Sequence, residues 1–120
     1  MGLDVSLVRT KWVSYDEGKT HTKEDEYVYD ANITHNLSKM AREAGIYESL
    51  WRPEEINKEK AEDIIELLEM GLADLKARPK HFEQFNSSNG WGMYEHFVPF
   101  VEKYLNACKE YPKCLIEISR

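Results

Sequence analysis

The sequence has few of the residues on which disulfide scaffolds, membrane anchors and nucleic-acid interfaces depend. Its two cysteines, Cys108 and Cys114, are too few for a disulfide framework, and without a secretion signal we expect buried, reduced thiols. No apolar run approaches membrane-spanning length, so we expect a soluble, cytoplasmic protein without a membrane partner. Lysine and arginine number 16 against 22 aspartates and glutamates, which gives a formal net charge of -6. This deficit of positive charge opposes binding to nucleic acid.

Complete catalytic and cofactor motifs are also missing. The four histidines are scattered without H-x-x-x-H spacing, and the cysteines form no C-x-x-C pair, so we expect no metal site and no cofactor. Cys108 falls on an apolar helical stripe, which predicts an unreactive thiol and not a nucleophile. We therefore assign no catalytic residue, and an enzyme such as a hydrolase is the weakest of the functions considered.

The composition suits one α+β domain that spans residues 1-120. Hydrophobic residues make up 42% of the chain, enough to bury a core, and we expect the domain to fold alone or as a small homo-oligomer. From Leu3 the chain alternates apolar and polar residues, and residues 20–34 are rich in β-branched and aromatic types. With turn residues from Tyr15 to Lys19 between them, these segments predict a long hairpin. Residues 114–119 predict another strand beside the first.

Three helices are expected to follow the hairpin. The first begins near Asn36 and ends at Gly45, and the second carries an apolar stripe from Ile56 to Leu75, with Asn57 as its cap and Pro79 as its end. The third carries a stripe from Tyr94 to Cys108, with a bend near Glu95 because of Pro99. Residues 46–55 are expected to form a connection and residues 79–85 a short turn. The fold class is therefore α+β: a small, mainly antiparallel sheet, made of the N-terminal hairpin and the C-terminal strand, packs its one face against about three helices.

The first candidate binding segment lies at the junction of strand and helix. An extended backbone would place Asn32, Thr34 and Asn36 on one side, and Arg52 could offer an anion a bidentate contact nearby. Helix capping is the alternative interpretation, because short polar side chains at such junctions commonly accept hydrogen bonds from free helix amides.

The second candidate segment is the sequence Asn89-Gly90-Trp91-Gly92, followed by Tyr94. Glycines permit positive φ angles and close backbone approach, so amides at this helix start could converge on an anion. Trp91 and Tyr94 could each offer a flat face to a nucleobase. The P-loop lysine and glycine spacing are missing, and Asn-Gly alone is an ordinary turn.

A larger pattern joins both segments. It comprises N-x-T-x-N-L-x-x-M from Asn32 to Met40, L-W-R-P, N-G-W-G-x-Y from Asn89 to Tyr94, Cys108 and a terminal I-S-R. The pattern resembles a family of small uncharacterised phage and bacterial proteins, over roughly residues 28 to 120. The resemblance implies a phage-type or prophage-type accessory protein without a defined activity. Pro99 departs from the pattern of the family and puts a straight third helix in doubt.

Two functions follow from these segments. The leading hypothesis is a non-catalytic module in which residues 32–36 and 89–94 converge on a pocket for a nucleotide-like or other anionic small molecule. A phage counter-defence protein could use such a pocket to sequester a nucleotide-like signalling molecule. The alternative is an acidic protein-interaction module that blocks or adapts a host protein through the run Glu24 to Glu26. That run is also typical of a solvated strand edge.

Overall fold

The computed structural model describes residues 2–14, 18 and 21–120. Strands β1 (Gly2–Ser14) and β2 (His21–Thr34) form a long antiparallel hairpin, and β3 (Leu115–Ser119) pairs antiparallel with the other side of β1. The strand order is therefore β2-β1-β3. The predicted α+β class and the pairing of the C-terminal strand with the first strand are confirmed. The expected turn at residues 15–19 lies, apart from Gly18, outside the described residues.

The two faces of the sheet differ sharply in burial. Leu3, Val5 and Leu7 of β1 are fully buried against the helices, because alternate residues of a strand point to the same side. The opposite side, which we call the open face, comprises Asp4, Ser6 and Val8 of β1 and the residues opposite them: Tyr27, Asp30, Asn32, Leu115, Glu117 and Ser119. Between Leu7 and Val8 the pairing shifts by one residue of β2, a β-bulge that places Val8 opposite Tyr27.

Five α-helices and two 3₁₀-helices are present in the described part of the chain. The 3₁₀-helix η1 (His35–Leu37) leads into α1 (Ser38–Glu43), which ends before Gly45, where φ is +77°. The remaining elements are α2 (Tyr47–Trp51), η2 (Pro53–Ile56), α3 (Ala61–Ala77), α4 (Pro79–Glu83) and α5 (Tyr94–Glu110). Pro53 and Pro79 each begin a helical turn, where the missing amide of proline costs nothing.

The sequence misplaced the start of the second helix. Asn57 adopts a left-handed conformation, with φ of 58°, at the end of η2, so it does not cap α3. The N-cap is Lys60, and the first two helix amides, of Ala61 and Glu62, donate to the carbonyls of Cys114 and Pro112, both at 2.9 Å. Asp63, in the first turn, accepts hydrogen bonds at its Oδ2 from the amides of Glu59 and Lys60 at 3.1 and 3.0 Å. These bonds lower the pKa of Asp63, the Lys60 amide having the larger effect. The segment expected as a connection also contains the short helix α2, whose Leu50 and Trp51 are buried in the core.

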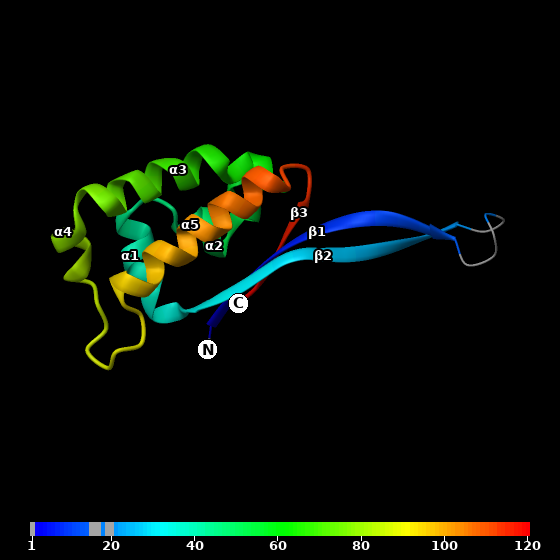
Figure 1. Ribbon diagram of the computed structural model, residues 1–120. Helices are drawn as coiled ribbons and strands as arrows, with labels where there is room; N and C mark the ends of the chain where they lie inside the picture. The colour runs from blue at the N-terminus through cyan, green and yellow to red at the C-terminus, as the bar shows by residue number, and fades with distance from the viewer. Residues whose placement is uncertain (1, 15–17, 19–20) are drawn as a thin grey trace.

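The core lies between the buried face of the sheet and the two long helices α3 and α5. Helix α5 continues without interruption through Pro99 and buries Phe97, Val101 and Tyr104. Figure 1 shows the helices gathered at one end of the sheet, while the other end of the hairpin extends away from them. We call this extension the arm: residues 9–14 and 21–26, beyond the pairing of β1 with β3. The molecule therefore measures 59 × 28 × 23 Å.

Candidate functional site

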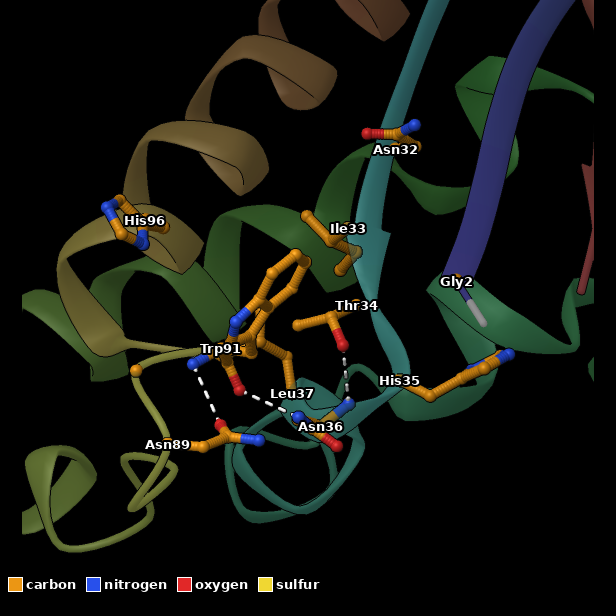
Figure 2. Close-up of a pocket in the computed structure, with 12 residues that line it drawn as sticks. Gly2, Asn32, Ile33, Thr34, His35, Asn36, Leu37, Asn89, Trp91 and His96 are labelled. Atoms are coloured by element: carbon orange, nitrogen blue, oxygen red, sulfur yellow. Dashed lines mark hydrogen bonds between the residues drawn. The ribbon is translucent and has the colours of Figure 1, made fainter.

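The two candidate segments lie side by side at the helical end of the sheet. A pocket of about 860 Å³ is lined by residues 32–37, from the end of β2 and η1, and by residues 89–92, from the loop before α5, together with Gly2 and His96. We call it the loop pocket (Figure 2). It is the size of a small-molecule site. Of the nine predicted site residues, seven line it: Asn32, Thr34, Asn36, Asn89, Gly90, Trp91 and Gly92.

A close backbone approach holds the loop on η1. The side-chain amide Nδ2 of Asn36 donates a hydrogen bond to the backbone carbonyl of Trp91 at 2.8 Å. Gly92 is buried there with a φ of +105°, and a Cβ atom on it would lie 2.7 Å from the Cβ of Asn36. Real Cβ atoms essentially never come so close. The second glycine of the motif therefore serves contact between the two segments.

The loop uses its own amides internally. Asn89 Oδ1 accepts hydrogen bonds from the Trp91 amide at 2.9 Å and from the Ser87 hydroxyl at 2.5 Å, and the Gly90 amide donates to the Ser87 carbonyl at 3.3 Å. The amides of Gly90 and Trp91 are therefore not available to an anion. Asn89 closes an ordinary Asx turn, which uses the Trp91 amide.

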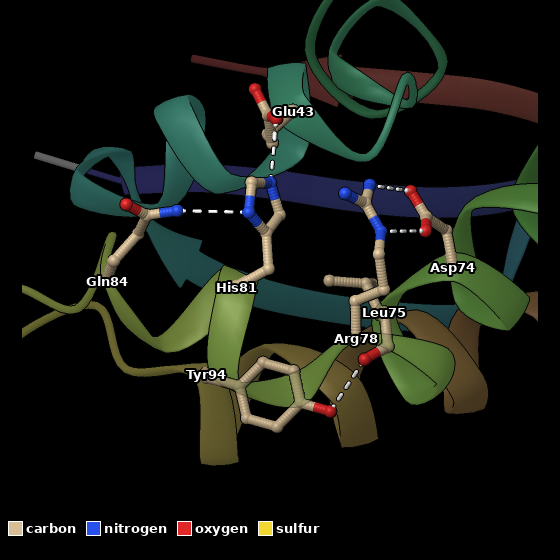
Figure 3. Close-up of polar contacts among 7 residues, drawn as sticks. All are labelled: Glu43, Asp74, Leu75, Arg78, His81, Gln84 and Tyr94. Carbon is tan, nitrogen blue, oxygen red and sulfur yellow. Dashed lines mark hydrogen bonds and ion pairs between the residues drawn. The ribbon is translucent and has the colours of Figure 1, made fainter.

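Tyr94 lies outside the loop pocket, contrary to the prediction. Its backbone amide donates to Asn86 Oδ1 at 2.6 Å and its hydroxyl to the Leu75 carbonyl at 2.7 Å (Figure 3). The half-buried ring thus ties the start of α5 to the end of α3. Its first position on α5 turns it toward the helix layer and away from the pocket.

Arg52 also lies outside the loop pocket. Its guanidinium Nη1 lies 3.1 Å from Glu55 Oε2. Side-chain hydrogen bonds raise the pKa of Arg52, the bond to Tyr47 having the larger effect and the bond to Glu55 the smaller. Arg42 lies over the Tyr47 ring, with 4.1 Å from its Cζ to the ring centroid. No lysine or arginine among the described residues lines the pocket, so its walls offer an anion no permanent positive charge.

Thr34 confirms the capping alternative for its own position. Its Oγ1 accepts a hydrogen bond from the Asn36 amide at 3.3 Å and caps η1. A threonine hydroxyl that accepts in this way can still donate its proton. Asn32, by contrast, remains exposed at the end of β2, and its side chain bonds none of the described residues.

Two of the histidines that lack metal-ligand spacing in the sequence, His35 and His96, also line the pocket. His35 Nδ1 accepts a hydrogen bond from the buried indole Nε1 of Trp51 at 2.8 Å. In the neutral ring the proton is therefore on Nε2, which leaves a donor available. His96 contributes an exposed ring from the first turn of α5 (Figure 2). The position of His35 between Thr34 and Asn36 could have indicated from the sequence that it lines the site. The hydrogen bond from Trp51 that orients its ring could not be predicted, because the two residues are 16 positions apart.

The loop pocket combines one broad apolar surface with uncharged polar groups. The Trp91 side chain is 68% exposed, and its ring rises from the loop toward Ile33 of β2 (Figure 2). Within the described part of the chain, Asn36 Oδ1 and Asn89 Nδ2 have no hydrogen-bond partner, although the other end of each amide is bonded. One acceptor and one donor therefore remain available in the loop pocket, and in Figure 2 they lie on the other side of the Trp91 backbone from its ring.

A second polar cluster joins α4 to its neighbours. His81 Nε2 lies 2.8 Å from Glu43 Oε1 on α1, and Gln84 Nε2 lies 3.0 Å from the other ring nitrogen (Figure 3). Arg78 forms two 2.7 Å bonds with Asp74, which lower the pKa of that carboxyl. Because each of these groups already has a partner, the cluster fastens helices together and does not form a ligand site.

The described residues include neither an exposed cysteine nor a cluster of metal ligands. Cys108 is fully buried, and burial raises the pKa of its thiol to about 12, which confirms the predicted unreactive cysteine. In residues 2–14, 18 and 21–120 no three His, Cys, Asp or Glu side chains are grouped as metal ligands would be. Nor does any helix in those ranges have the length and apolar character needed to cross a bilayer.

The acidic run on the arm is largely neutralised by its neighbours. Glu24 and Glu26 face Lys11 and Arg9 across the hairpin, and Arg9 Nε lies 3.0 Å from Glu26 Oε2. This ion pair lowers the pKa of Glu26. Only Asp25 of the run alternates to the other side of the strand, so the three residues do not form one acidic surface.

Comparisons with known proteins give no assignment, since no protein-family model, curated protein or solved structure matches this chain.

Proposed function

We propose that the protein is a non-catalytic binding module whose loop pocket holds a small molecule with a flat, hydrogen-bonding ring, such as the base of a nucleoside or nucleotide. The observation that carries this proposal is that one pocket contains both the exposed Trp91 indole and two unpartnered polar atoms, Asn36 Oδ1 and Asn89 Nδ2. An indole stacks on any base, and an acceptor and a donor in the same pocket suit the polar groups of a nucleoside.

The walls of the pocket favour the ring of such a ligand over its phosphate. The amides of Gly90 and Trp91 are bonded within the loop, and no arginine or lysine among the described residues lines the pocket. The anionic part of a nucleotide would therefore extend into solvent. A protein that holds such a ligand without transforming it would sequester it. Sequestration would suit a counter-defence role, and the resemblance implies a phage-type or prophage-type accessory protein. A cytoplasmic location, where nucleotides occur, is part of the proposal.

Thermal unfolding in the presence of nucleosides and nucleotides tests the ligand class. We expect at least one nucleoside to raise the Tm, and its monophosphate to raise the Tm equally, because the ring supplies the affinity. A large gain from the phosphate would point to an anion site instead. The absence of any shift across nucleobases, nucleosides, nucleotides and cyclic nucleotides would contradict the proposal.

The two exposed tryptophans provide a matched pair of variants. Trp91→Ala removes the stacking surface but keeps the backbone carbonyl that Asn36 binds, whereas Trp12→Ala removes a similarly exposed indole from the arm. Base stacking on an aromatic ring contributes roughly 1–3 kcal/mol, so Trp91→Ala should weaken binding about tenfold or more and Trp12→Ala should not. Equal affinities of the two variants would exclude Trp91 as the stacking surface.

Asn89→Asp tests the polar contact without opening the loop. Aspartate keeps the oxygen that accepts from Trp91 and Ser87, but it replaces the Nδ2 donor. We expect weaker ligand binding with an unchanged Tm of the free protein. Asn89→Ala would remove both functions of the side chain and is the less informative variant.

A further inference from the structure

The open face of the sheet carries a row of exposed apolar side chains. Tyr27, Val8 and Leu115 lie in register on β2, β1 and β3, and Tyr27 and Leu115 are 54% and 50% exposed. Trp12 lies on the same side of the sheet, farther along the arm, opposite Lys23, and is 64% exposed. Trp12, Tyr27 and Leu115 are three of the five large hydrophobic residues left exposed among the described residues; the other two are Met70 and Trp91.

The Tyr27 ring is fixed across the central strand. Its hydroxyl lies 3.0 Å from both carboxylate oxygens of Glu117 on β3, and β1 runs between these two strands. The ring therefore crosses β1, and Val8, which lies opposite Tyr27 on that strand, is only 6% exposed. A rigid aromatic platform costs little side-chain entropy when a partner docks.

The charges of this face are predominantly negative. Asp4, Asp30 and Glu117 are joined on the arm by Asp25, which lies opposite Thr10. Against these four carboxylates, the described part of this side has two lysines, Lys23 and Lys60, the latter bridged to Leu115. The other side of the arm is balanced, because Glu24 and Glu26 face Lys11 and Arg9. The acidic character thus belongs to one face of the sheet and not to the acidic run as a whole.

The same face already accommodates a cation on an aromatic ring. The Lys23 ammonium lies 5.3 Å from the centroid of the Trp12 ring, within the range of a cation–π contact. A ring with carboxylates at hand suits an arginine or lysine side chain better than another apolar group. A second copy of the chain would bring these carboxylates against themselves, and like charges at an interface oppose association.

We propose that the open face docks an extended, positively charged segment of another protein, whose arginine or lysine side chains lie on Trp12 and Tyr27 and pair with Asp4, Asp30 and Glu117. The segment runs along the strands, since aromatic and acidic groups extend from the arm to the base of the sheet. This interaction surface is separate from the Trp91 indole and goes beyond the proposed ligand binding.

An alternating arginine–alanine peptide of about ten residues tests the proposal, because an extended chain of that length covers the span from Trp12 to Asp4 at roughly 3.3 Å per residue. Isothermal titration calorimetry on the full chain should show binding of this peptide and none of the matching glutamate–alanine peptide. We expect Trp12→Ala, and the double variant Asp4→Asn/Asp30→Asn, each to weaken binding roughly fivefold.

Two matched variants separate a docking surface from attraction by net charge. Glu66→Gln/Glu83→Gln removes the same charge from exposed positions on α3 and α4, and Trp91→Ala removes an exposed indole outside the open face. Both should bind the peptide as the parent does. The proposal would be overturned if Glu66→Gln/Glu83→Gln weakened binding equally or if the peptide did not bind at all. A dimer of the protein that Trp12→Ala dissociates would also overturn it, because a second copy would then be the occupant of the open face.

Discussion

At the scale of the residue, the buried Tyr104 and the half-buried Tyr94 have opposite hydrogen-bonding states. The Tyr104 hydroxyl is fully buried without a partner in the described part of the chain, and burial raises its pKa well above the usual value. The Tyr94 hydroxyl donates to the Leu75 carbonyl at 2.7 Å. An unsatisfied buried hydroxyl costs about 1–3 kcal/mol, whereas a made hydrogen bond contributes about 1 kcal/mol. Tyr104→Phe should therefore raise the free energy of unfolding by about 1 kcal/mol.

Tyr94→Phe is the control for that substitution. It removes the same hydroxyl and leaves the Leu75 carbonyl unpaired, so it should lower the free energy of unfolding by about 1 kcal/mol. Urea denaturation of both variants measures the two effects. Destabilisation by Tyr104→Phe would show that its hydroxyl has a partner, such as a buried water.

At the scale of the element, the two glycines of the loop differ in what surrounds them. Both have a positive φ, but a Cβ on Gly92 would lie 2.7 Å from Asn36 Cβ, whereas one on Gly90 meets no atom within 4 Å. A strained backbone costs about 1–3 kcal/mol for either alanine. Gly92→Ala should exceed Gly90→Ala in destabilisation because it also pushes the loop off η1.

Chemical denaturation combined with the side-chain amide signal of Asn36 measures that difference. Gly92→Ala should shift the Asn36 Nδ2 resonances toward those of a solvated amide, and Gly90→Ala should leave them in place. Equal effects of the two alanines on stability and on Asn36 would mean that the loop does not rest on η1.

The elements also show how far the sequence could predict the fold and the site. The alternation at Leu3, Val5 and Leu7 predicted the strand, because period two determines which side chains face the core. The start of α3 was misplaced because its first amides, of Ala61 and Glu62, bond carbonyls about fifty residues along the chain, which no local capping pattern reveals. The segments of the loop pocket were found by their polar and glycine content. Arg52 and Tyr94 lie outside the pocket for different reasons: Arg52 pairs locally with Glu55, three residues along the chain, whereas the contact of Tyr94 with Leu75 depends on helix packing.

At the scale of the whole molecule, the arm gives the protein an elongated shape. A compact domain of this length has a radius of gyration of about 14 Å, but the Cα atoms of this structure give 16.5 Å. Small-angle X-ray scattering should accordingly report a maximum dimension consistent with 59 Å. A radius of about 14 Å would contradict the structure, because it would require the arm to fold back and cover the open face.

The most direct test of ligand binding at the loop pocket is a ¹H–¹⁵N NMR titration of the protein with a nucleoside panel. The indole N–H of Trp91 lies in the pocket and that of Trp12 lies on the arm, so one spectrum contains both the probe and its control. Binding between the loop and η1 predicts saturable shifts of the Trp91 indole and of the Asn36 and Asn89 side-chain amides, with the Trp12 indole unchanged. Shifts confined to other residues, or no saturable shift with any nucleoside, would contradict it.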